Sequence, residues 1–116
     1  LKRHYEWWVI MLALHKIGAI VIPATHMLTK HDIVYRNTRA SVKAIICVDD
    51  AYVTSQIMLA KSESPTVAQY IAIGDNVPDG FHDYLKEIGQ APAFVKPASW
   101  SGLRMPSSRM ARRPGR

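Results

Sequence analysis

The run Ala44-Ile45-Ile46-Cys47-Val48, followed at once by Asp49 and Asp50, is the stretch of this sequence that decides the fold. Five apolar residues without a break, ended by charged ones, have the length and texture of a strand that is buried on both faces. Strands of this kind occur in parallel sheets whose two faces are covered by helices. The run therefore predicts an α/β fold.

Helical patterns flank the run on both sides. Upstream, Thr29 and Asp32 have the spacing of a capping box, with Asp in place of the usual Glu, so that a helix begins at about Lys30. Near the start of the chain, a segment that is apolar nearly all round ends at Gly18, a plausible C-terminal stop. The helices predicted from periodicity and stop signals span residues 5–17, 30–41, 51–61 and 81–88.

Two further short apolar runs have the length of strands. Ala19–Ile22 is rich in β-branched residues and is ended by Pro23, and Tyr70–Ile73 precedes Gly74. Helices and strands then alternate along the chain, which predicts βαβ units and a mostly parallel, three-stranded layered subdomain with flanking helices over residues 1–97. Such a small sheet leaves its edges uncovered, so we expect a tendency to self-association.

The chain has 116 residues, of which 48% are hydrophobic and 21% charged, as in one globular domain. Residues 7–22 form the most apolar stretch, and it is interrupted by charged residues and glycine before it reaches the roughly 18 residues of a membrane span. The sequence starts at Leu1 without a signal-peptide pattern, which is typical of the interior of a longer protein. Cys47 is the single cysteine and suits a reduced core thiol, which predicts a cytoplasmic location.

The net charge of +6 comes from the end of the chain. Residues 1–97 carry ten cations and nine anions, whereas residues 98–116 carry five arginines and no acid. This last stretch has no periodicity, so we expect a disordered basic tail. Two interpretations of the tail stay open: a polyanion binder through its arginines, and an out-of-frame reading of a GC-rich gene. The near-neutral body does not predict a nucleic-acid partner.

Known phosphate-binding and nucleophile motifs are not found in the sequence. His26 and His31 are five positions apart, which is not the spacing of a zinc site on a helix, and we predict no metal ligand. Asp49 and Asp50 follow a parallel strand, where ligands bind in open α/β sheets, but two acids there also cap the next helix. The segment Trp7-Trp8-Val9 fits core packing better than an interaction stripe.

An ordered series of short matches resembles the N-terminal part of the adenylate-forming (AMP-binding) acyl-CoA synthetases, in the acetate and medium-chain branch. The matches cover roughly residues 3–97. They consist of Glu6-Trp7-Trp8, Lys16-Ile17-Gly18-Ala19, Ile22-Pro23-Ala24-Thr25, Leu28-Thr29, Asp32-Ile33, Tyr35-Arg36 and Lys43-Ala44-Ile45-Ile46-Cys47.

The resemblance implies an ATP-dependent acid–CoA ligase. In this family a carboxylate attacks the α-phosphate of ATP, giving an acyl-adenylate, and coenzyme A then displaces AMP; magnesium shields the phosphates. The family's phosphate loop normally follows the region that matches residues 94–97, and the basic tail stands there instead. The resemblance therefore carries over no catalytic residue and implies a fragment that is inactive alone, with the carboxylic acid, ATP, magnesium and coenzyme A as ligands of the intact enzyme only.

One binding segment of the family does fall inside the match. It corresponds to Thr25, His26 and Met27, which in relatives lie near the coenzyme A nucleotide. Met27 stands where close relatives have a polar amide side chain, so it lacks that hydrogen-bonding group. Whether this chain is itself an enzyme stays open, because a small standalone α/β module that binds a nucleotide or coenzyme A would also use such strand-end loops.

Overall fold

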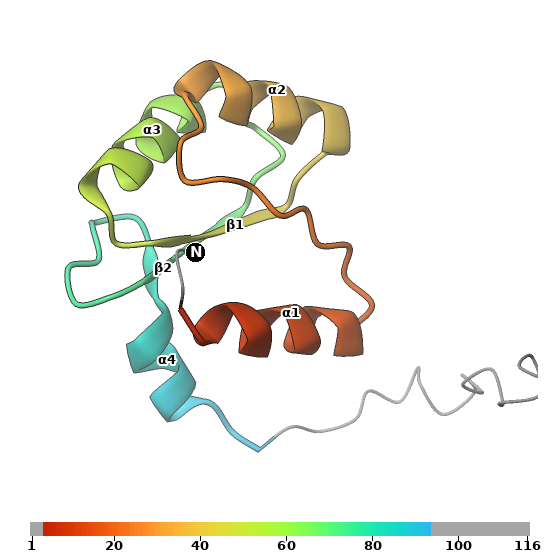
Figure 1. Cartoon of the computed structure of the whole chain (residues 1–116), viewed down its shortest axis with the longest axis vertical. Coiled ribbons are helices and arrows are strands. Elements are labelled where there is room, and N and C mark those ends of the chain that lie inside the picture. The colour runs from red at the N-terminus through yellow and green to blue at the C-terminus, as the bar shows by residue number, and fades with distance from the viewer. Residues whose placement is uncertain (1–3, 94–116) are drawn as a thin grey trace, which may run out of the picture.

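The computed structural model of the chain describes residues 4–93. Figure 1 shows a small sheet with helices on both of its sides. The predicted tail over residues 98–116 lies outside the described residues. In chain order the elements are α1 (Glu6–Lys16), α2 (Lys30–Ala40), β1 (Ala44–Val48), α3 (Ala51–Lys61), β2 (Gln69–Ile73), β3 (His82–Asp83) and α4 (Tyr84–Gln90).

The three strands form one parallel sheet in the order β1-β2-β3. β1 and β2 are in register from Ala44 opposite Gln69 to Val48 opposite Ile73. β3 is short and pairs with β2 through His82 opposite Ile71. In Figure 1, α2 and α3 lie above the sheet, while α1 and α4 lie below it. The predicted α/β class with three parallel strands and flanking helices is confirmed.

The predicted strand over Ala19–Ile22 is wrong. The stretch forms no ladder with β1, and its one backbone hydrogen bond runs from Ala19 N to Leu14 O in the last turns of α1. Ile20 is 93% exposed. A run of β-branched residues becomes a strand only where its backbone reaches a sheet edge, and sequence periodicity does not report that distance. The third strand is instead β3.

Three predicted helices agree closely with α1, α2 and α3, and their ends explain why. Gly18 has φ +75° and donates its N–H to His15 O, so α1 ends where a left-handed residue is tolerated. At the start of α2, the Thr29 hydroxyl accepts from Asp32 N, and the Asp32 carboxylate accepts from Thr29 N at 3.1 Å. This is the predicted capping box. The fourth helix begins three residues later than predicted, because Asp83 accepts from Lys86 N and caps α4.

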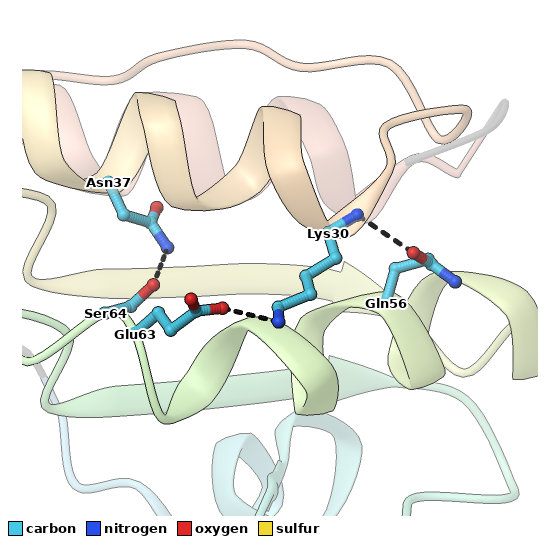
Figure 2. Close-up of polar contacts among 5 residues, drawn as sticks. All are labelled: Lys30, Asn37, Gln56, Glu63 and Ser64. Carbon is cyan, nitrogen blue, oxygen red and sulfur yellow. Dashed lines mark hydrogen bonds and ion pairs between the residues drawn. The ribbon is translucent and has the colours of Figure 1, made fainter.

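The hydrophobic core lies between β1, β2 and the two helices above them. It consists of Ile33, Cys47, Ile57, Ala60, Val67, Tyr70 and Ala72. Polar contacts, drawn in Figure 2, join α2 to α3 and to the turn that follows α3, at the margin of this core. Asn37 Nδ2 donates to Ser64 Oγ at 2.9 Å, and both residues are buried. At the other end of α2, Lys30 N donates to Gln56 Oε1, and the Lys30 ammonium pairs with Glu63.

Helix α1 is set apart from the other elements. The pairs of elements that pack closely involve β1 to β3 and α2 to α4, and within residues 4–93 α1 belongs to none of them. Its inner face holds Ile10, which is 8% exposed. The prediction that Trp7-Trp8-Val9 packs in the core is wrong for two of the three residues, since Trp8 is 67% and Val9 44% exposed. The helix is apolar all round, but only one side of it faces the rest of the chain.

Candidate functional site

A cavity of about 800 Å³ separates α1 from the body of the fold. Its walls are α1, the connecting stretch 18–28, one face of α2 and the length of β1. Its volume is in the range of small-molecule sites, about 300–1,000 Å³. The side chains along it are mostly aliphatic, and the few polar ones include Thr25, His26 and Arg36. This cavity is the most site-like feature in the described part of the chain.

The loop that holds the candidate residues Thr25, His26 and Met27 is only partly directed at the cavity. Thr25 and His26 line it. Met27 is 71% exposed and is not among the lining residues, although its N–H donates to Thr25 Oγ1 at 3.3 Å. The structure therefore brings two of the three predicted residues together at the cavity wall and leaves the third on the surface.

Both acids after β1 are engaged in holding the backbone. The Asp50 side chain accepts from Tyr52 N at 2.9 Å and from Val53 N at 3.3 Å, so it caps α3. Asp49 Oδ2 accepts from Asn76 N at 3.1 Å. Of the two readings of this pair, helix capping is correct for Asp50, while Asp49 anchors the loop after β2. No hydrogen bond joins either acid to residues 25–27 in the described structure.

Gly74 completes this arrangement at the carboxyl end of the sheet, and its role was not predicted. Its φ is +147°, and a Cβ built there would lie 2.0 Å from Asp49 Cγ. The missing side chain makes the space in which the Asp49 carboxylate reaches Asn76. A glycine directly after a strand is a weak sequence signal, because it also occurs in ordinary turns. Gly74 and Asp49 therefore have a structural role, which is to hold the loop after β2 against the carboxyl end of β1.

Cys47 is buried in the core, as predicted, and is 5% exposed. Burial raises the pKa of its thiol to about 12, with the nearby Asp49 charge adding to the rise. A thiol with such a pKa is almost wholly protonated at neutral pH. Cys47 therefore does not have the character of a nucleophile.

The described residues do not assemble a metal centre. Within residues 4–93 there is no group of three His, Cys, Asp or Glu side chains that could hold a metal ion. His26 and His31 lie on a loop and at the start of α2. Mg²⁺ is usually held by one or two carboxylates together with phosphate oxygens and water, so these residues alone do not supply its full set of ligands. Among the same residues, no helix is both long enough and apolar enough to span a bilayer.

Comparison with known proteins identifies related sequences. No family model matches the chain. Human acyl-coenzyme A synthetase ACSM1, mitochondrial, is 30% identical over 84 residues, which are 72% of this chain and 14% of the relative. Human ACSM2A is 29% identical over 91 residues, 78% of this chain and 15% of the relative. Human ACSM5 is 28% identical over 90 residues, 75% of this chain and 15% of the relative. The chain thus spans about a seventh of the length of these curated relatives.

Proposed function

This chain is a relative of the acyl-coenzyme A synthetases, and on that premise we propose that it is one segment of an ATP-dependent acid–CoA ligase. The observation that carries the proposal is the similarity over roughly three quarters of the chain to three such enzymes. The reaction proposed for the intact enzyme joins a carboxylic acid to coenzyme A through an acyl-adenylate, with ATP and Mg²⁺.

We further propose that the chain is inactive by itself. Its candidate acids, Asp49 and Asp50, each accept hydrogen bonds from backbone N–H groups and so have structural roles, and Cys47 is a buried, protonated thiol. The described residues therefore supply a scaffold and one cavity wall, and neither a nucleophile nor a metal site. We expect no acid-dependent exchange of pyrophosphate into ATP by the purified chain. Human ACSM2A serves as the positive control, and magnesium-dependent exchange by this chain would refute the proposal.

Thr25, His26 and Met27 are proposed as a loop on the coenzyme A side of the intact enzyme. In support, Thr25 and His26 lie on the wall of the large cavity. Met27 is exposed and has no hydrogen-bonding group to offer, so its proposed contribution is limited to packing against a ligand. In the alternative of a standalone binding module, the same loop would act without the rest of the enzyme. Calorimetry with coenzyme A and with ATP separates the two, because only a complete site gives saturable heat.

The remaining expectations stay predictions. Deletion of residues 98–116 followed by chromatography on a polyanion column tests the basic tail, and unchanged retention would remove that function. The cytoplasmic location is tested by cell fractionation, since the relatives carry the word mitochondrial in their names. Self-association through the outer edges of β1 and β3 is tested by sedimentation with substitutions in those strands.

A further inference from the structure

We draw no further inference here: the strongest candidate, the apolar cavity of about 800 Å³ between α1 and β1, belongs to the site already described, and nothing in the described part of the structure shows whether a ligand or another part of a longer protein fills it.

Discussion

Ser64→Ala tests how much of the stability comes from the buried contact between α2 and the turn that follows α3. The change removes the hydroxyl that accepts from Asn37 Nδ2 at 2.9 Å (Figure 2). Asn37 is 4% and Ser64 2% exposed, so water does not replace the lost acceptor. A buried donor left without a partner costs about 1–3 kcal/mol. For a domain of this size each kcal/mol lowers the melting temperature by about 4–8 °C.

The neighbouring ion pair provides the matched comparison. The Lys30 and Glu63 side chains are 44% and 53% exposed, so their pairing is screened by water and contributes about 0–1 kcal/mol. Lys30→Ala removes only this pair, because the backbone N–H of residue 30 still donates to Gln56. Urea unfolding followed by circular dichroism gives the free energy of unfolding for both variants. Ser64→Ala is expected to be the more destabilised.

A third variant separates the unsatisfied donor from the lost volume. In Asn37→Leu/Ser64→Ala both polar partners are replaced by apolar side chains, so no buried donor is left, and we expect a loss smaller than that of Ser64→Ala alone. If Ser64→Ala costs no more than Lys30→Ala, or if the double variant is the least stable of the set, the buried hydrogen bond does not have the assigned role.

Three other predictions concern single residues. Gly74→Ala is destabilised by at least about 1–3 kcal/mol, because its Cβ would collide with Asp49; thermal unfolding measures the loss, and Gly74→Ala/Asp49→Ala recovers part of it. The pKa of the Cys47 thiol is about 12 in the folded chain, against 9.0 for a free thiol, so its thiolate fraction is about a thousandfold smaller. We therefore expect Ellman's reagent at pH 8 to react slowly with the folded chain and faster once urea unfolds it. Equal rates for the folded and the unfolded chain would show that the thiol is accessible. The pKa of Asp32 is lowered mainly by its hydrogen bond from the Thr29 hydroxyl. The stability that the Asp32 carboxylate contributes is therefore complete above the pKa of the unfolded chain, and it is lost as the pH falls through the lower pKa of the folded chain. In a plot of melting temperature against pH, Asp32→Asn should reduce the decline at acid pH, and an unchanged profile would contradict this.

The parts of the fold that could be predicted are those encoded locally. The capping box at Thr29 and the stop at Gly18 depend on side chains within a few residues of the helix ends, and both are as predicted. β1 is predictable because five consecutive apolar residues that end at charged ones are typical of a buried strand. β3 could not be, since His82 and Asp83 have no β pattern and pair only because the loop after Gly74 brings them alongside β2.

The candidate site was predictable only in part, because it depends on distances through space. The sequence places Thr25 and His26 in a loop, but not on the wall of a cavity whose other walls are α1 and β1. For Asp49 and Asp50 the sequence alone allows either a ligand site or a helix cap. The hydrogen bonds of each carboxylate in the structure show that Asp50 caps α3 and that Asp49 holds the loop after β2. Trp8 was assigned to the core because a helix that is apolar all round does not reveal which side is covered.

Because α1 packs closely against none of the other described elements, we expect it to open as a cooperative unit of its own. Amide hydrogen exchange reports such units, because each opens with its own free energy. The amides of β2, which lies between two strands, should exchange only through global unfolding, whereas those of α1 should exchange through detachment of the helix alone.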